Sequence, residues 1–187
     1  MKKISFLMKN YYNNKIQLSK ILILKILKNI VNKNKKVLIF GMGHDSILWY
    51  KANNSKNIFF VESDENYINL NSEINKKNII KYKYKNINVF KSLKNEIDPS
   101  VYELPQKLER NKPFDVILID APQGYADNLP GREIPYYWSR YKLMHSKTKI
   151  YMDDIKRPLE LHLLKKYYFD FQLQYFEERN GSACVFL

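Results

Sequence analysis

Apolar and polar positions follow one another along this chain in blocks that predict strands and helices in turn. Four short apolar runs, each stopped by glycine or by polar residues, are typical of buried strands; they cover residues 37–41, 57–63, 114–120 and 148–154. Stretches compatible with helices lie between and after them, at residues 46–53, 64–76, 133–146 and 157–168. Strands that alternate with helices predict βαβ units and a parallel sheet.

The two ends of the chain have patterns of their own. Residues 16–31 place apolar side chains at helical spacing, so we expect an amphipathic helix that, within an N-terminal segment 1–35, covers one face of the sheet. Near the C-terminus the runs 170–178 and 182–187 are joined by Arg179-Asn180-Gly181, and Asn-Gly is a strong signal for a hairpin turn.

The middle of the chain is less regular. Residues 79–86 alternate and are compatible with an edge strand, whereas residues 87–113 contain Pro99, Pro105 and Pro113 and are expected to be irregular, with short helices at most. A mostly parallel α/β sheet that ends in an antiparallel C-terminal hairpin is the layout of the Rossmann-like methyltransferases that use S-adenosylmethionine. We therefore expect a single domain of that class over residues 1–187.

Composition narrows the possible partners. The formal charge is +13, from 32 Lys+Arg against 19 Asp+Glu, but the excess consists mainly of lysine scattered among Asn and Ile, and arginine is scarce. This pattern does not favour a nucleic-acid partner; an anionic substrate such as a uronate or a phosphorylated sugar fits better. The one cysteine, Cys184, cannot form an intramolecular disulfide. Lysines interrupt the apolar stretch 16–31, so we expect no membrane span and a cytoplasmic protein.

Acidic residues gather where the predicted strands end. Asp45 follows the first strand, Glu62 closes the second, Asp120 closes the third buried run, and Asp153 and Asp154 close the last one. Ligands of open α/β sheets bind at this edge, so we expect these side chains to converge. The alternative is that each one simply caps a helix.

Gly41 and Gly43 allow the backbone after the first strand to turn tightly and approach a ligand. The third glycine of the dinucleotide motif is replaced by Ser46, which disfavours a pyrophosphate. Asp45 is placed to meet an ammonium group, Glu62 is placed to accept hydrogen bonds from ribose hydroxyls, and His44 is expected to shape the loop. These features favour S-adenosylmethionine as the cofactor.

Asp120, Asp153 and Asp154 offer hard oxygen ligands from neighbouring strand ends, which suits Mg²⁺ or Mn²⁺. A hydroxyl bound to such a metal loses its proton more easily, and Asp120 or Asp154 is expected to serve as base or metal ligand. The alternative is that one aspartate caps a helix and the other pairs with Lys156 or Arg157.

The polar segment DAPQGYADNLPGR, residues 120–132, is expected to form a loop over the site. Within it, Tyr125 is placed to stack on a sugar, and Arg132, together with Arg157, to hold a carboxylate or phosphate. The alternative is an ordinary surface loop with surface arginines.

Four segments, GMGHDSILW, FFVESDENYI, FDVILIDAPQGYADNLPGR and YMDDIKR, occur in an order and at separations that resemble the plant glucuronoxylan 4-O-methyltransferase family. The resemblance extends from about residue 37 to 168. It implies S-adenosylmethionine as methyl donor, dependence on a divalent metal (Mg, Mn or Co), and transfer to a hydroxyl of a uronic acid, in that family the 4-hydroxyl of glucuronate on xylan.

By position, the resemblance assigns two sets of residues. Those serving the cofactor are Gly41, Gly43, Asp45, Ser46 and Glu62; those serving the substrate and the chemistry are Asp120, Tyr125, Arg132, Asp154 and Arg157. The family has His-Asp-Val-Asp-Arg where this chain has Asp153-Asp154-Ile155-Lys156-Arg157, so the surroundings of any metal differ. Alternatives are a methyltransferase acting on RNA or a small aromatic molecule, and a binding module without catalysis.

Overall fold

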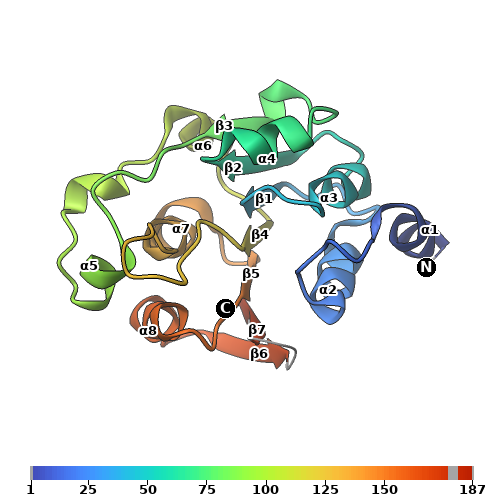
Figure 1. Cartoon of the computed structure of the whole chain (residues 1–187). Coiled ribbons are helices and arrows are strands. Elements are labelled where there is room, and N and C mark those ends of the chain that lie inside the picture. The colour runs from blue at the N-terminus through green and yellow to red at the C-terminus, as the bar shows by residue number, and fades with distance from the viewer. Residues whose placement is uncertain (1, 177–180, 187) are drawn as a thin grey trace.

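The structure is a computed structural model that describes residues 2–176 and 181–186. Its centre is a seven-stranded sheet in the order β3-β2-β1-β4-β5-β7-β6 (Figure 1). The strands are β1 (Val37–Phe40), β2 (Ile58–Glu62), β3 (Ile79–Lys81), β4 (Val116–Ile119), β5 (Lys149–Asp153), β6 (Gln172–Phe176) and β7 (Ser182–Phe186).

Strands β1 to β5 are parallel to one another, whereas β7 pairs antiparallel with both β5 and β6. The predicted α/β class and the antiparallel hairpin at the C-terminus are therefore confirmed. Because strands β1, β2, β4 and β5 are parallel, the loops that follow them emerge at the same edge of the sheet.

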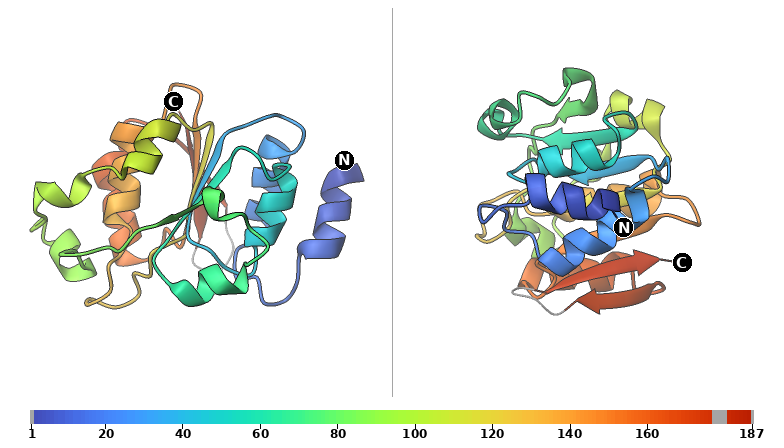
Figure 2. Two further views of the ribbon diagram at one scale, coloured as in Figure 1. Left: turned by 90° about the horizontal axis from the view of Figure 1, so that it is seen from above. Right: turned by 90° about the vertical axis from the view of Figure 1, so that its right-hand side faces the viewer.

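Helices cover both faces of the sheet (Figures 1 and 2). One face carries α1 (Lys2–Tyr11), α2 (Lys20–Ile30) and α3 (Ser46–Ala52), and the other carries α5 (Val89–Leu93), α6 (Gln106–Asn111), α7 (Glu133–Trp138) and α8 (Pro158–Tyr167). Helix α4 (Glu65–Leu70) follows β2, and short turns of helix lie at η1 (Lys76–Asn78), η2 (Pro99–Tyr102) and η3 (Ser139–Leu143). Each face of the sheet has its own apolar core.

The hydrophobic pattern placed the strands well but several helix ends wrongly. The helix expected over 16–31 begins at Lys20, because the Ser19 hydroxyl accepts a hydrogen bond from the backbone N–H of Leu22 and caps it. The helix expected over 64–76 ends at Leu70, where the Asn71 amide donates to the carbonyl of Tyr67. Helix α1 lies within the N-terminal segment 1–35, which was expected to be helical, although no separate helix was predicted there.

Two further expectations need adjustment. The edge strand predicted over 79–86 is only β3, and the expected helix 133–146 is α7 followed by one wider, π-type turn, η3. Residues 87–113 hold three short helical segments, as expected. Of the predicted hairpin turn, Gly181 is described and has a φ of +71°, whereas Arg179 and Asn180 lie outside the described residues.

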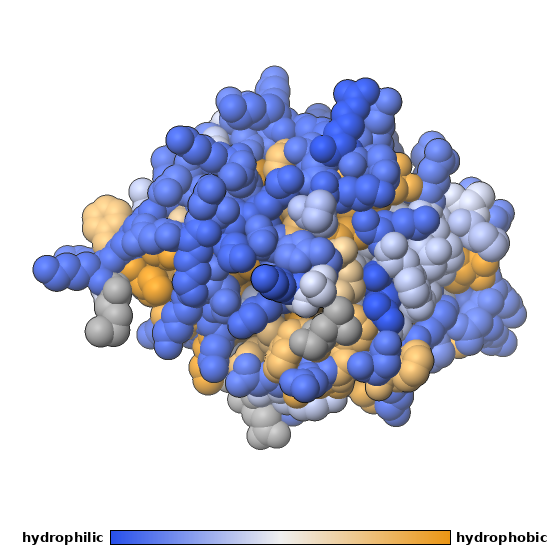
Figure 3. Space-filling view, turned by 180° about the vertical axis from the view of Figure 1, so that it is seen from behind, coloured by the Kyte–Doolittle hydropathy of each residue, from blue (hydrophilic) through white to orange (hydrophobic). Residues whose placement is uncertain are grey.

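The surface is mainly polar. Figure 3 shows that the face behind the view of Figure 1 is covered largely by hydrophilic side chains. Among the described helices, none combines the length and the apolar character needed to cross a bilayer.

Candidate active site

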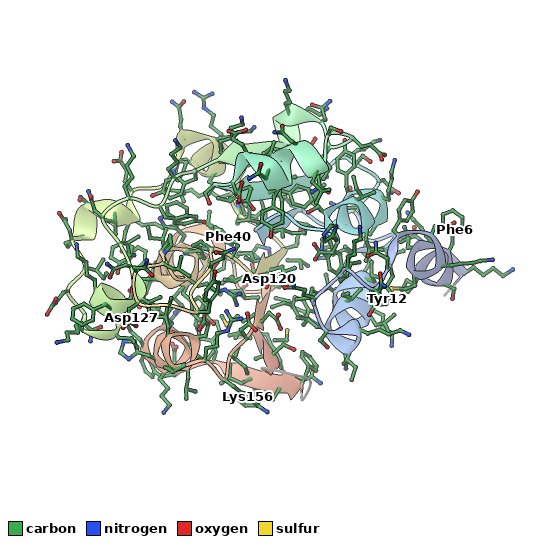
Figure 4. The ribbon with its side chains drawn as sticks, in the orientation of Figure 1. Phe6, Tyr12, Phe40, Asp120, Asp127 and Lys156 are labelled. Carbon is green, nitrogen blue, oxygen red and sulfur yellow. The ribbon has the colours of Figure 1, made fainter. Side chains whose placement is uncertain are left out.

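Three of the predicted acidic residues come together at the edge where the parallel strands end. Asp120 follows β4, Asp153 is the last residue of β5, and Asp154 comes next; one carboxylate oxygen from each lies within 4.8 Å of the others. Figure 4 shows Asp120 near the centre of the view, between the helices of the two layers. We call these three residues the carboxylate trio.

The loop after β1 passes against the loop after β4 at Gly41. This glycine has a φ of +110°, and a Cβ atom added there would lie 2.8 Å from the Cβ of Ala121. Both facts require glycine at this position. Gly43 is less constrained, since an added Cβ would lie 3.3 Å from Oδ1 of Asp45. The turn is closed by Ser46, whose buried hydroxyl accepts a hydrogen bond of 2.8 Å from the Gly43 N–H.

Glu62 ties this loop to the end of β2. Its Oε2 accepts a 2.7 Å hydrogen bond from the N–H of Met42, and its Oε1 accepts bonds of 2.6 and 2.8 Å from the N–H groups of Ser63 and Asp64. The carboxylate is thus held at a fixed place beside the glycines. That is the position from which a strand-end acid contacts a ribose.

Asp45 precedes helix α3 but does not cap it. Its Oδ2 accepts a 2.8 Å hydrogen bond from the indole N–H of Trp49, which is fully buried. Burial raises the pKa of Asp45, and the Trp49 bond and the nearby His44 lower it again by smaller amounts. The imidazole of His44 itself is exposed. The role of Trp49 is therefore to hold the Asp45 carboxylate, and the sequence did not reveal this role.

Arg132 lies at the centre of the acidic region. Its side chain is 3% exposed, and its guanidinium donates to the backbone carbonyls of Asp153 and Asp120, each at 2.6 Å, and to Oδ2 of Asp154 at 2.9 Å. Its Nη2 also lies 3.3 Å from Oδ1 of Asp120. Almost none of the guanidinium surface is left for a substrate, contrary to the expectation that Arg132 holds the acceptor.

A fourth carboxylate, Glu160 on α8, approaches Arg132 from the other side, with 3.7 Å between Oε1 and Nε. The Glu160 side chain is fully buried, and neither of its oxygens has a hydrogen-bond partner. Glu160 was not among the residues predicted from the sequence. The available signal was its position three and four residues before Leu163 and Leu164, which places it on the buried face of the helix.

Asp154 has a φ of +58°, a strained conformation for a residue other than glycine. Its Oδ2 also forms an ion pair, at 2.9 Å, with Nη2 of Arg157, whose side chain is 27% exposed. The predicted alternative of a pair between an aspartate and Arg157 is therefore present, alongside the trio rather than in place of it. Arg157 retains open surface, unlike Arg132.

The loop 120–132 carries no regular helix or strand, as expected. Tyr125 is 70% exposed on it, so its ring faces solvent and is accessible. The loop is anchored at its end by Gly131, which has a φ of +69° and an N–H that donates to the carbonyl of Gln123 at 2.9 Å. A Cβ atom at Gly131 would lie 2.5 Å from Leu159, so the loop packs directly on α8.

Burial, reinforced by neighbouring carboxylates, raises the pKa values of Asp120 and Asp153. Loss of hydration raises the pKa of Asp120 well above its usual range; Asp153 adds to this shift and Arg132 opposes it, although 37% of the Asp120 side chain remains exposed. Burial, with help from Asp154, raises the pKa of Asp153 to about 6. An acid whose pKa approaches neutrality is suited to accept a proton in catalysis.

The donor set fits a hard divalent cation. The trio supplies carboxylate oxygens at mutual separations below 4.8 Å, and Mg²⁺ or Mn²⁺ prefers such ligands. The end of β2 fits an adenosyl cofactor, because three backbone N–H groups fix the Glu62 carboxylate beside the glycine loop. The two halves of the site adjoin where Gly41 meets Ala121.

Comparison with known proteins identifies relatives of this chain. No protein-family model matches the chain. The chain is similar to glucuronoxylan 4-O-methyltransferase 2 of Arabidopsis thaliana, at 30% identity over 159 residues, covering 71% of this chain and 54% of that protein. It is also similar to arabinogalactan O-methyltransferase 2 of the same plant, at 25% identity over 149 residues, covering 66% of this chain and 51% of that protein. The chain thus spans about half the length of the curated relatives it matches.

Solved structures share the fold. They include the O-methyltransferase TomG from Streptomyces achromogenes in complex with SAM, with a TM-score of 0.54 and 13% identity over 100% of this chain and 88% of that chain. The SAH-bound methyltransferase PaMTH1 of Podospora anserina has a TM-score of 0.51 and 12% identity, covering 99% and 93%. An O-methyltransferase from Bacillus cereus in complex with SAH has a TM-score of 0.53 and 13% identity, covering 100% and 89%.

Proposed function

We propose that this chain, a distant relative of the glucuronoxylan 4-O-methyltransferases, transfers a methyl group from S-adenosylmethionine to a hydroxyl of an anionic, glucuronate-type sugar. The observation that carries the proposal is the carboxylate trio, which lies beside a glycine loop at the carboxyl edge of a methyltransferase sheet. The glucuronate-type acceptor is inferred from the relatives and from Arg157, which lies beside the trio.

The cofactor is assigned to the glycine loop and the end of β2. Gly41 and Gly43 let the backbone approach the ligand, Glu62 accepts hydrogen bonds from the ribose hydroxyls, and Asp45 faces the ammonium group. Ser46 and His44 shape the turn, Ser46 through its bond to the Gly43 N–H. When bound, S-adenosylmethionine supplies the methyl group.

The trio is assigned to the acceptor hydroxyl, and Asp120 borders both halves of the site through Ala121. The Asp120 carboxylate takes the proton of the acceptor hydroxyl, a role that suits its raised pKa. Asp120, Asp153 and Asp154 would hold a divalent cation (Mg²⁺, Mn²⁺ or Co²⁺), which would make the acceptor hydroxyl more acidic. Asp154 would either bind this cation or replace Asp120 as the base.

Residues with solvent-exposed surface are assigned to bind the acceptor. Arg157 is placed to pair with the acceptor's carboxylate, and Tyr125 to stack on its ring. Arg132 instead holds Asp120 and Asp154 in position, because its guanidinium is already occupied by protein oxygens. The enzyme's main contribution is then alignment of the hydroxyl with the methyl group.

The test is transfer of labelled methyl from S-adenosylmethionine to a panel of acceptors, with and without a chelator. The panel holds glucuronate-bearing oligosaccharides, nucleotide sugars, a catechol and an RNA. We expect label in the glucuronate-bearing acceptors and its loss with the chelator. Label in the catechol or the RNA alone would replace the proposed acceptor, and no transfer to any acceptor by protein that binds the cofactor would favour a non-catalytic module.

A further inference from the structure

A pocket away from the carboxylate trio lies on the face of the sheet that carries α2. It is a pocket of about 240 Å³ between α2 and strands β5, β7 and β6. Its polar lining consists of Lys25, Lys28, Asn29, Lys149 and Gln174, and its apolar lining includes Phe176. We call it the lysine pocket.

The alternation of side chains along the strands creates this pocket. Tyr151 and Cys184 face each other across β5 and β7 and join the core under α2, while their neighbours Ile150 and Val185 belong to the core on the opposite face. Helix α2 covers β5 but does not extend over the whole hairpin. Figure 2, right, shows β6 and β7 below α2 without a helix in front of them.

The charge of the pocket is one-sided. Lys25, Lys28 and Lys149 line it, and none of the three forms an ion pair with a carboxylate in the part of the chain that the structure describes. Among the described residues that line the pocket, none is acidic. Three ammonium groups around one small space attract an anion.

The remaining lining suits a sugar more than an inorganic anion. The Lys25 ammonium lies 5.5 Å from the centre of the Phe176 ring, so a charged group and an aromatic surface are adjacent. The Gln174 amide offers a donor and an acceptor for hydroxyls, and Asn29 offers its amide oxygen, since its Nδ2 already donates to the Lys25 carbonyl and to the Tyr151 hydroxyl. The volume is below the roughly 300–1,000 Å³ usual for drug-sized ligands, which fits one sugar unit.

The lysine pocket is separate from the carboxylate trio. Lys149 is the first residue of β5 and Asp153 the last, so about 13 Å of strand lies between them. A ligand that reaches both must be a chain of linked units rather than a single small molecule.

We propose that the lysine pocket binds a uronate unit of the acceptor glycan at a distance from the sugar that is methylated. This inference rests on the proposed function, because it takes its occupant from the proposed acceptor class. The pocket contributes affinity and selects extended acidic chains over isolated sugars.

Lysine acylation with mass-spectrometric detection tests the site directly on the whole protein. A glucuronate-bearing oligosaccharide is expected to slow acylation of Lys25, Lys28 and Lys149 at least about threefold while leaving the exposed Lys77, Lys91 and Lys165 unchanged. The carboxyl-reduced oligosaccharide and inorganic phosphate are the comparison ligands. Equal protection of both lysine groups, or equal protection by either comparison ligand, would overturn the proposal.

Variants provide the second measurement. Replacing Lys25, Lys28 and Lys149 by Gln is expected to weaken oligosaccharide binding, measured by calorimetry, by about tenfold or more, because charged hydrogen bonds are lost. The matched control replaces Lys77, Lys91 and Lys165 by Gln and lowers the net charge equally. Equal weakening in the two variants contradicts the proposal. Binding needs no methyl transfer, so a failure of the proposed activity leaves this result distinct.

Discussion

The glycine loop after β1 and the carboxylate trio after β4 and β5 lie side by side, yet different interactions hold them. In the loop, a carboxylate is satisfied by neutral donors: Glu62 accepts from three backbone N–H groups. Around the trio, charged groups face one another directly, with Arg132 bound to Asp120 and Asp154 at distances of 3.3 Å or less.

The balance of charge differs accordingly. Around the trio four carboxylates meet only two guanidinium groups; the carboxylates belong to Asp120, Asp153, Asp154 and Glu160, and the guanidinium groups to Arg132 and Arg157. Burial is the main cause of the raised pKa values of Asp120 and Asp153, and the neighbouring carboxylates add to it, so these groups bind a proton more readily. The Glu62 carboxylate in the loop accepts three backbone hydrogen bonds, whereas the trio region keeps an excess of negative charge that favours binding of a proton or a cation.

The strongest way to separate the two regions is Asp120→Asn. Loss of the carboxylate that accepts the hydroxyl proton should lower methyl transfer by about 10²- to 10⁴-fold. Initial rates with labelled S-adenosylmethionine measure this effect. Asp127→Asn is the matched control, because Asp127 is exposed on the same loop and lies apart from Asp120 in Figure 4. Equal rates in the two variants would remove Asp120 from the chemistry.

Arg132→Met should cause the largest loss of stability. Removing one partner leaves buried carboxylates without their counter-charge, which costs about 3–5 kcal/mol in the free energy of unfolding. Urea titration measures it. Arg157→Met is the comparison, since its partly exposed pair with Asp154 should contribute no more than about 1 kcal/mol. A similar loss in both variants would show that the ion pairs around the trio do not differ as described.

Gly41→Ala probes the loop. The φ of +110° and the 2.8 Å approach to Ala121 should cost about 2–3 kcal/mol in the free energy of unfolding and weaken cofactor binding. Gly43→Ala should cost less than about 1 kcal/mol, because its φ is ordinary and the nearest atom to an added Cβ is a side-chain oxygen at 3.3 Å. Thermal unfolding of each variant, with and without cofactor, measures the change in stability and the change in cofactor binding. A larger loss of stability in Gly43→Ala than in Gly41→Ala would mean that the loop does not pack against Ala121.

The smallest effect concerns pH. Burial and Asp154 raise the pKa of Asp153 from 3.8 to about 6, so the folded protein keeps a proton that the unfolded chain has lost. The free energy of unfolding of the wild type should therefore fall, by up to about 2 kcal/mol through this group, as pH rises from about 4 to about 6. Asp153→Asn should reduce that decline, while Asp127→Asn should keep it. Parallel curves for wild type and Asp153→Asn would contradict the raised pKa.

Local signals predicted the loop better than the trio's surroundings. Gly41, Gly43 and Glu62 were recognisable because a strand end, a turn and an acid occur at short, fixed separations. The burial of Arg132 was not recognisable, since its partners are 12 to 28 residues away and only the packed fold brings them together. Arginine in a polar loop therefore looked like a surface ligand.

The same reason explains the other misses. Trp49 was given no role from the sequence, because its hydrogen bond to Asp45 depends on the geometry of the first turn of α3. Helix α1 mixes lysine and apolar residues and is held by packing against α2 and α3, which no local pattern reports. The lysine pocket combines residues from α2, β5 and the C-terminal hairpin, where the lysines looked like part of a scattered excess.

The most direct test of the account compares two matched acceptors with the wild-type protein. One is a glucuronate-bearing oligosaccharide, and the other is the same oligosaccharide with the carboxyl group reduced. If Arg157 recognises the carboxylate of the acceptor, kcat/KM for labelled methyl transfer should be at least about tenfold higher for the glucuronate-bearing oligosaccharide than for the reduced one. The reason is that a lost charged hydrogen bond costs about 1.5–3 kcal/mol. Equal values for the two acceptors would contradict the claim that this site methylates an anionic sugar.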